Sequence, residues 1–208
     1  MNPVLMIFID GVGIGKKDYQ YNPFFKYGFK TFAQLFDDIP AIDKQRLSKN
    51  GCYVFPIDAN LGVDGLPQSG TGQVSIFCGM NAPKFIGKHF GPFPYSTTIP
   101  VIESLNIFKS YIEADKRVCF ANAYPQVFFE YMNSGKTRLN VTALSAKSAG
   151  LRLNDVNDVI DGNALTAEIT NERWNKNLNY KLSVISPESA AGRLINIALK
   201  NDFTLYEF

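Results

Sequence analysis

Histidine and cysteine are scarce in this sequence. Its 208 residues include one histidine, His89, and three cysteines, Cys52, Cys78 and Cys119. The odd number and wide spacing of the cysteines exclude a disulfide framework and a Cys-x-x-Cys metal site, and they predict reduced thiols in a cytoplasmic protein. A single histidine cannot supply the ligands of two transition-metal sites.

The shortage of histidine also disfavours a serine esterase of the α/β-hydrolase type. That mechanism needs a histidine as general base, and only His89 is present. The stretch QSGTG, at residues 68–72, also differs from the Gly-x-Ser-x-Gly nucleophile elbow.

Charge imbalance and long apolar runs are lacking as well. The net charge of +2 is too small to indicate nucleic acid or an anionic membrane as the main partner. The N-terminal MNPVLMIFID has no basic segment, and its short apolar run predicts a strand rather than a signal peptide or membrane span. With 46% hydrophobic residues, including 17 Phe and 10 Tyr, we expect a globular cytoplasmic protein.

Apolar runs and helical patterns alternate along the chain. The segment 133–180 is polar with weak periodicity, and the Gly/Pro-rich segment 81–98 predicts an irregular excursion. The alternation predicts an α/β fold in which helices flank a mostly parallel sheet, as one domain over 1–208 with a candidate cap or insertion at 81–180. The patterns predict strands at 4–9, 51–58, 117–121, 182–185 and 202–208, and helices at 24–37, 73–78, 99–112, 126–132 and from Ser186-Pro187-Glu188 onward.

Asp10 directly follows the first predicted strand and precedes three glycines. Ligands of open α/β sheets bind beyond the carboxyl ends of strands, so this carboxylate is placed to hold a cation. The alternative is a turn aspartate beside glycines that supply positive φ. The sequence GVGIGKK that follows fits neither the dinucleotide fingerprint nor the phosphate-binding P-loop.

A second candidate site lies in DGLPQSGTGQVSIFCG, residues 64–79. Ser69 precedes a predicted helix, whose free N–H groups favour an anion, and Gly70 and Gly72 let a substrate approach the backbone. A hydroxyl activated by a metal can attack phosphorus. The alternative is an ordinary helix N-cap.

MIFIDGVGIG followed by GLPQSGTGQVSIFCGMNAP resembles the alkaline phosphatase superfamily, in particular cofactor-independent phosphoglycerate mutase and phosphopentomutase. The resemblance covers about residues 4–93. It implies Ser69 as the nucleophile and Asp10 and Ser69 as ligands of two divalent metal ions, Zn, Mn or Mg. Because Gln73 stands where the family has a histidine and Gln68 where it has Asn or Asp, Thr71 is a reserve nucleophile.

The resemblance also implies a phosphorylated small molecule as substrate. Gly70, Gln73 and His89 are candidate substrate contacts, with an ordinary loop role as the alternative for His89. The family's remaining Asp and His ligands, expected from the C-terminal half, are not in this sequence.

We therefore expect an alkaline phosphatase-like fold that is incomplete at its C-terminus. The expected function is that of the N-terminal portion of a metal-dependent phosphatase or phosphomutase, inactive as this chain alone, with a homodimer or a C-terminal partner chain. The alternative is a non-catalytic relative that has lost the metal site and binds an anion or a partner.

Overall fold

The computed structural model describes residues 2–136 and 138–208. The chain divides into two compact units. One contains the residues up to Asp10 together with Asn60–Phe208, and the other is Gly11–Ala59. The candidate site residues all belong to the first unit.

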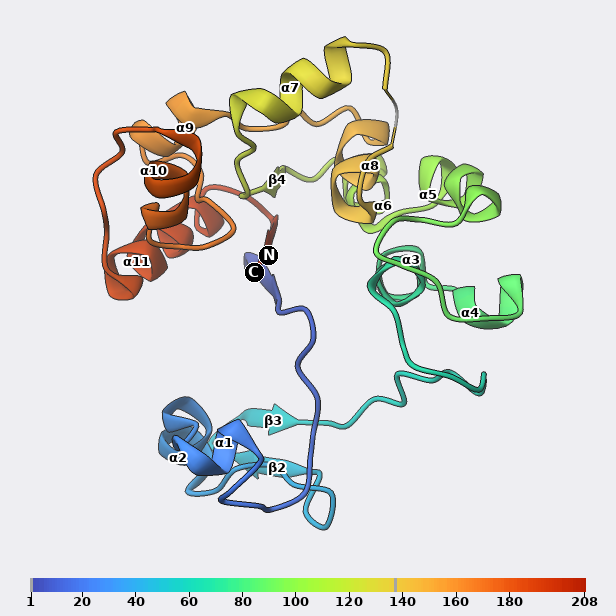
Figure 1. Ribbon diagram of the computed structural model, residues 1–208, viewed down its shortest axis with the longest axis vertical. Coiled ribbons are helices and arrows are strands. Elements are labelled where there is room, and N and C mark those ends of the chain that lie inside the picture. Colours follow the sequence, from blue (N-terminus) through green and yellow to red (C-terminus); the bar gives the residue numbers. More distant parts are fainter. Residues whose placement is uncertain (1, 137) are drawn as a thin grey trace. The chain divides into compact units, whose positions relative to one another are not determined.

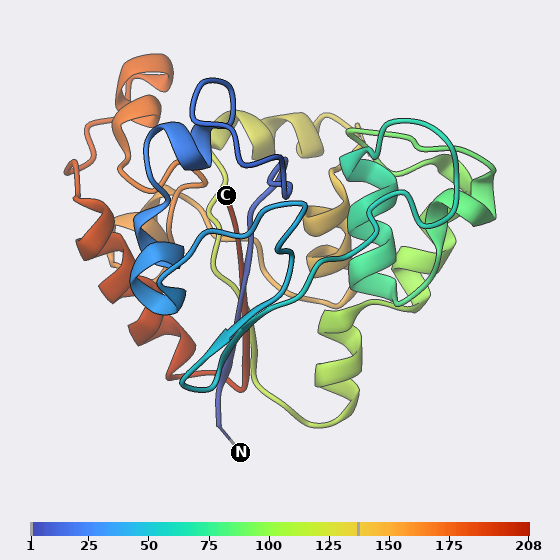
Figure 2. The same cartoon turned by 90° about the horizontal axis from the view of Figure 1, so that it is seen from below.

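A three-stranded parallel sheet lies at the centre of the first unit. Its strands are β1 (Val4–Phe8), β4 (Val118–Phe120) and β5 (Phe203–Glu207), in the order β1-β5-β4. Phe203 is in register with both Val4 and Val118. β1 and β5 run side by side in Figure 2, so the carboxyl ends of all three strands meet at one edge.

Helices flank both faces of this sheet, as Figure 1 shows. The predicted α/β class with a parallel sheet is therefore confirmed. One face is covered by α3 (Ser69–Cys78), α5 (Ile99–Ser104), α6 (Ile107–Glu113) and α8 (Val141–Ser148). The other face is covered by α10 (Glu172–Leu178) and α11 (Pro187–Ala198). The remaining helices of this unit are α4 (Ala82–Ile86), the 3-10 helix η1 (Ser96–Thr98), α7 (Gln126–Asn133) and α9 (Val156–Ile160).

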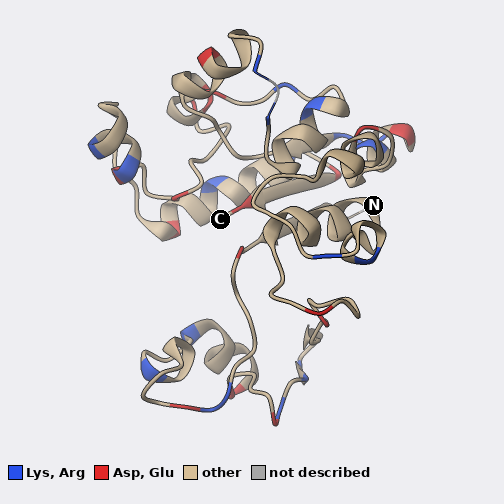
Figure 3. Cartoon of the chain, turned by 45° about the vertical axis from the view of Figure 1, so that its right-hand side comes forward, with Lys and Arg blue, Asp and Glu red and all other residues tan. Residues whose placement is uncertain are grey.

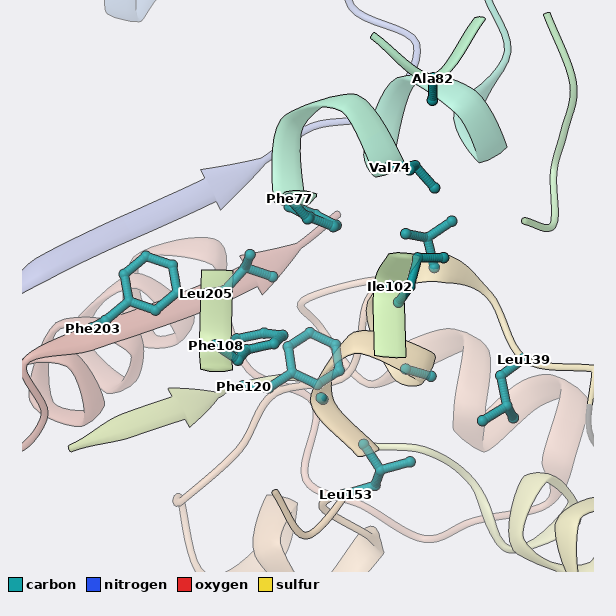
Figure 4. Close-up of a cluster of buried hydrophobic side chains, with 13 residues drawn as sticks. Val74, Phe77, Ala82, Ile102, Phe108, Phe120, Leu139, Leu153, Phe203 and Leu205 are labelled. Carbon is teal, nitrogen blue, oxygen red and sulfur yellow. The ribbon is translucent and has the colours of Figure 1, made fainter. Parts of the chain in front are cut away.

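Alternation along β5 divides its side chains between two apolar clusters. Phe203 and Leu205 pack with Phe108 on the face of α3 and α6, as Figure 4 shows. Tyr206 points the other way and packs with Leu194 of α11. This two-residue period holds the strand in register, because a slip of one residue would exchange its two faces.

The second unit consists of α1 (Pro23–Lys26), α2 (Lys30–Phe36) and an antiparallel pair, β2 (Leu47–Lys49) and β3 (Cys52–Val54). The prediction of one helix over 24–37 is wrong. Gly28 lies between the two helices with φ +71, a left-handed conformation that ends α1.

Other predicted boundaries also need correction. The helix expected at 99–112 breaks at Leu105, and Asn106 caps α6 by accepting a hydrogen bond from the Lys109 amide. The helix expected at 73–78 begins earlier, at Ser69. The segment 81–98 contains α4 and η1 rather than only irregular chain.

The strand predicted at 182–185 is wrong, because the Leu182 amide bonds to the Asn175 side chain instead of to a strand. β4, by contrast, lies within 81–180, so part of the range in which the sequence predicts a cap belongs to the sheet. α11 begins as expected, with Ser186 as its N-cap. Its twelve residues are too few to cross a membrane, and none of the other described helices has the necessary length and apolarity.

Candidate functional site at the carboxyl edge of the sheet

Asp10 lies at the carboxyl edge, just beyond β1. The Phe208 amide donates to the Phe8 carbonyl at 2.9 Å, and the Asp10 amide donates to the Phe208 carbonyl at 3.3 Å. These bonds continue the β1–β5 ladder to Asp10, so its backbone is held against the neighbouring strand. Its side chain is exposed at the position where parallel sheets bind ligands.

Ser69 is joined to Asp10 across 59 residues of sequence. The Ser69 hydroxyl donates to Asp10 Oδ2 at 2.7 Å. Ser69 is the first residue of α3, and Gln68 precedes it as the extended N-cap residue. The interpretation of Ser69 as an ordinary N-cap is therefore wrong, because its side chain bonds to the end of β1. The two candidate motifs form one site.

Gly70 lies where the chain 90–93 passes closest to α3. A Cβ at Gly70 would be 2.3 Å from the Phe93 carbonyl oxygen and 2.6 Å from that of Phe90. Gly70 is buried, so its predicted role in substrate contact is joined by a packing role that only glycine can fill.

Thr71 is occupied by the same loop. Its hydroxyl donates to the Gln68 carbonyl at 3.2 Å and accepts from the Phe90 amide at 3.3 Å. The Thr71 side chain is 1% exposed, whereas Ser69 is only partly buried. Of the two candidate nucleophiles, Ser69 is the one that contacts Asp10, so the geometry favours Ser69.

Gln73 lies one turn after Ser69 and contacts the next strand. Its side-chain amide donates to Glu207 Oε1 at 2.6 Å. Burial raises the pKa of Glu207, and the negative charge of Asp10 raises it further, while the Gln73 hydrogen bond opposes both. Gln73, a predicted substrate contact, is buried and engaged by Glu207.

Asn122 fixes the backbone from which Glu207 projects. Its Nδ2 donates to the Glu207 carbonyl at 2.7 Å, and its Oδ1 accepts from the Glu207 amide at 2.8 Å. Glu207 is the last residue of β5. Figure 3 shows in red and blue how the acidic and basic residues are distributed along the chain. Sequence reasoning missed both Asn122 and Glu207. Each stands at the end of a predicted strand, and the edge rule that singled out Asp10 points to them equally.

His89 is placed with another loop. Its Nε2 lies 3.0 Å from the Val63 carbonyl oxygen. Its Nδ1 is buried without a hydrogen-bond partner among the described residues. The structure does not bring His89 together with Asp10 and Ser69 through any hydrogen bond of the described residues, so a role in substrate contact stays a prediction.

Two adjoining cavities open at the carboxyl edge. One has a volume of about 700 Å³ and extends from Asp10 and Phe208 to α10. The other, of about 360 Å³, is lined by Asn122, Tyr124 and Glu207. Asp10 and Phe208 line both cavities, so the acceptor of the Ser69 hydroxyl stands where the two spaces meet.

The side chains at this edge fit part of the ligand shell of one hard cation. Asp10 and Ser69 offer a carboxylate and a hydroxyl, the oxygen donors that Mg²⁺ and Mn²⁺ prefer to the nitrogen and sulfur donors of zinc sites. Within residues 2–136 and 138–208, no three His, Cys, Asp or Glu side chains form a group that could hold a metal ion. These described residues alone therefore do not fit a two-metal centre.

Comparisons of the chain with protein-family models, with curated proteins and with solved structures found no match.

Proposed function

We propose that this chain forms the N-terminal portion of a metal-dependent phosphoryl-transfer enzyme of the phosphatase or phosphomutase type, with an alkaline phosphatase-like fold. The observation that carries the proposal is the 2.7 Å hydrogen bond from Ser69 to Asp10 at the carboxyl edge of the sheet. The resemblance of MIFIDG and QSGTGQ to the motifs of that superfamily supports the same two residues.

Ser69 is the nucleophile of the proposed reaction. Its Oγ forms a bond to phosphorus while the bond from phosphorus to the ester oxygen breaks, and the Ser69 proton ends on the departing alcohol. The Asp10 carboxylate accepts a hydrogen bond from the Ser69 hydroxyl. The hydroxyl hydrogen therefore points toward Asp10, and a lone pair of Ser69 Oγ points away from the carboxylate. The dipole of the ten-residue α3 favours the negative charge of a phosphoryl group beside Ser69, whereas the Thr71 amide is already bonded to the Phe90 carbonyl.

Phosphoryl transfer depends mainly on positioning and on the stabilisation of charge. Asp10 and Ser69 would hold a divalent cation through their oxygens, and such a cation supplies neutralisation of the phosphoryl oxygens. Gln73 and Glu207 keep α3 against β5, so Ser69 stays at a fixed place relative to the end of β1. Further metal ligands would come from a partner chain.

The proposal is tested by capture of the covalent intermediate. The protein is incubated with p-nitrophenyl phosphate and Mg²⁺ or Mn²⁺, quenched in acid and digested, and the phosphopeptide is located by mass spectrometry. Because turnover would need the further metal ligands, we expect at most one phosphate per chain, on Ser69 and not on Thr71, and no continued release of p-nitrophenol. The matched control is Ser96→Ala, which changes an exposed serine of η1, whereas Ser69→Ala removes the nucleophile.

Binding of orthovanadate gives a second measurement that needs no turnover. Vanadate imitates the five-coordinate phosphorus of the transition state, and it should bind wild type and Ser96→Ala but bind Ser69→Ala more weakly. If wild type neither acquires phosphoserine nor binds vanadate with either metal, the proposal is wrong. Binding of an anion or a partner without catalysis would then be the function to examine.

A further inference from the structure

The larger cavity at the carboxyl edge is connected to Ser69 only through Asp10, which lines the cavity and accepts the Ser69 hydrogen bond. It lies between Asp10 and Phe208 at the strand ends and Trp174 and Leu178 of α10. In the proposed reaction, the alcohol portion of an ester attacked by Ser69 would extend past Asp10 into this space. The cavity of about 700 Å³ has room for a small organic group.

The charge of this cavity is negative. Its walls carry the carboxylates of Asp10, Glu168 and Glu172 and one guanidinium, that of Arg173. The balance is three negative charges against one positive. A divalent cation bound at Asp10 would still leave Glu168 and Glu172 against Arg173 on the walls that face the alcohol.

Glu168 is fixed in position by its neighbours. Its Oε1 accepts from the Trp174 amide at 3.0 Å, and its Oε2 accepts from the Thr170 hydroxyl at 3.3 Å. The Glu168 charge therefore cannot swing away from a ligand in the cavity as an unrestrained surface carboxylate could.

The smaller cavity gives no compensating cation. It contains Glu207 and Asp10, together with the polar groups of Asn122, Tyr124 and Asn140, and none of its described lining residues is a lysine, arginine or histidine. A second acid group on the substrate would face carboxylates in either cavity. Hydroxyl and ammonium groups, by contrast, would find acceptors, and Trp174 and Phe208 offer apolar contact for the carbon chain.

We propose that the substrate is a phosphate monoester of an uncharged or cationic alcohol, and that the cavity selects against alcohols that carry a carboxylate or a second phosphate. This inference rests on the proposed function, because it takes Ser69 as the point of attack. The selecting groups are Glu168 and Glu172, and Arg173 reduces the selection by supplying the one positive charge.

The test compares three esters that differ in the charge of the alcohol. The alcohol portion of glycerol 1-phosphate is uncharged. In 3-phosphoglycerate a carboxylate replaces its terminal hydroxymethyl group, and the alcohol portion of O-phosphoethanolamine carries an ammonium group. Dissociation constants are measured by calorimetric titration of the wild-type protein with each ester in the presence of Mg²⁺ at low ionic strength. We expect the neutral and cationic esters to bind at least about tenfold more tightly than 3-phosphoglycerate, and the ratio to fall as salt is added.

Variants of the cavity wall assign the effect. Glu172→Gln should reduce the discrimination against 3-phosphoglycerate several-fold, and Arg173→Gln should increase it. Glu130→Gln, which removes an exposed acid of α7 outside the cavity, is the control and should leave the ratio unchanged.

The outcomes separate this inference from the proposed function. If 3-phosphoglycerate binds as tightly as glycerol 1-phosphate while p-nitrophenyl phosphate still phosphorylates Ser69, only the substrate class is wrong. If the esters bind with the expected ratio and no phosphoserine forms, the cavity recognises such esters and the proposed chemistry is wrong. If no ester binds and no phosphoserine forms, both proposals are overturned.

Discussion

Gln73 and Glu207, 134 residues apart, are joined by a 2.6 Å hydrogen bond that runs from α3 to the end of β5. One turn earlier on the same helix, Ser69 makes the corresponding bond to Asp10 at the end of β1. Residues four apart share one face of a helix, and β1 and β5 are neighbours in the sheet. The two bonds therefore fix both the position of α3 and its rotation about its own axis.

Replacement of Gln73 should destabilise the protein. Gln73→Leu keeps a similar side-chain volume but removes the amide group that donates a hydrogen bond to Glu207 Oε1. The largely buried Glu207 oxygen is then unpaired, which should lower the free energy of unfolding by about 1–3 kcal/mol. Urea unfolding of the purified variant measures this loss. Gln126→Leu, at the exposed first residue of α7, is the control. A Gln73→Leu variant as stable as this control would show that the bond contributes nothing.

Replacement of Asn122 should lower the stability of the protein more than replacement of an ordinary buried amide side chain. The Asn122 side chain bonds both the amide and the carbonyl of Glu207. Asn122→Ala leaves both backbone groups without a hydrogen-bond partner, and each lost bond should lower the free energy of unfolding by about 1–3 kcal/mol. Asn122→Asp keeps the acceptor for the Glu207 amide but loses the donor, and it adds a negative charge beside β5. We expect both variants to unfold at lower urea concentration than Asn196→Ala, a control on the exposed face of α11. Equal midpoints for the three variants would contradict this role.

Local patterns in the sequence predicted the strands of the sheet and the start of α11 well. The run at 4–9 and the Ser-Pro-Glu sequence at 186–188 each contain their own signals, apolar side chains in one case and a cap in the other. The helix breaks at Gly28 and Leu105 were missed because the apolar spacing continues across them. The strand expected at 182–185 failed because Asn175, distant from any strand signal, takes its backbone bonds.

The candidate site was predictable only in part, for a related reason. Asp10 and Ser69 stand beside glycines, which mark them in the sequence. Glu207 and Asn122 have no such marker, and their meeting depends on the strand order β1-β5-β4. That order follows from packing of the helices on the two faces of the sheet rather than from any local pattern. The acidic lining from Glu168 and Glu172 likewise lies in a polar segment with only weak periodicity.

Two glycines of α3 should respond in opposite ways to the same substitution. Gly70→Ala places a methyl group 2.3 Å from the Phe93 carbonyl oxygen, so the chain 90–93 must move, at a cost of about 1–3 kcal/mol or more. At Gly72, a methyl group would have open space, because no described atom lies within 4 Å of it apart from the adjacent residues and the backbone of the helix. Gly72→Ala should therefore stabilise α3 by up to about 1 kcal/mol.

Thermal unfolding of the two alanine variants beside wild type tests this difference. Because loop 90–93 packs on the first turn of α3, Gly70→Ala should also reduce phosphorylation of Ser69. A rise in midpoint for both variants would mean that the loop yields freely and that the close approach at Gly70 is not required.

The stability of the first unit should fall in acid partly through Asp158. Burial acts to raise the pKa of this carboxyl group, but hydrogen bonds from the Arg152 guanidinium and the Asp155 amide outweigh it, and the net shift is downward. A pKa that is lower in the folded than in the unfolded state gives stability that is present above the unfolded value of about 4. This contribution is lost as the pH falls through the folded value.

Urea unfolding between pH 7 and pH 3 measures this dependence. Asp158→Asn should be less stable than wild type at pH 7, and the difference should shrink as the pH falls below the unfolded pKa of about 4 toward the lower folded pKa. Arg152→Gln should give the same convergence to a smaller extent, because the Asp155 amide still donates to Asp158. The Arg152 side chain is 67% exposed, so solvent screens the ion pair, and added salt should reduce the difference at pH 7. Curves for wild type and Asp158→Asn that stay parallel from pH 7 to pH 3 would show that Asp158 titrates alike in the folded and unfolded chain.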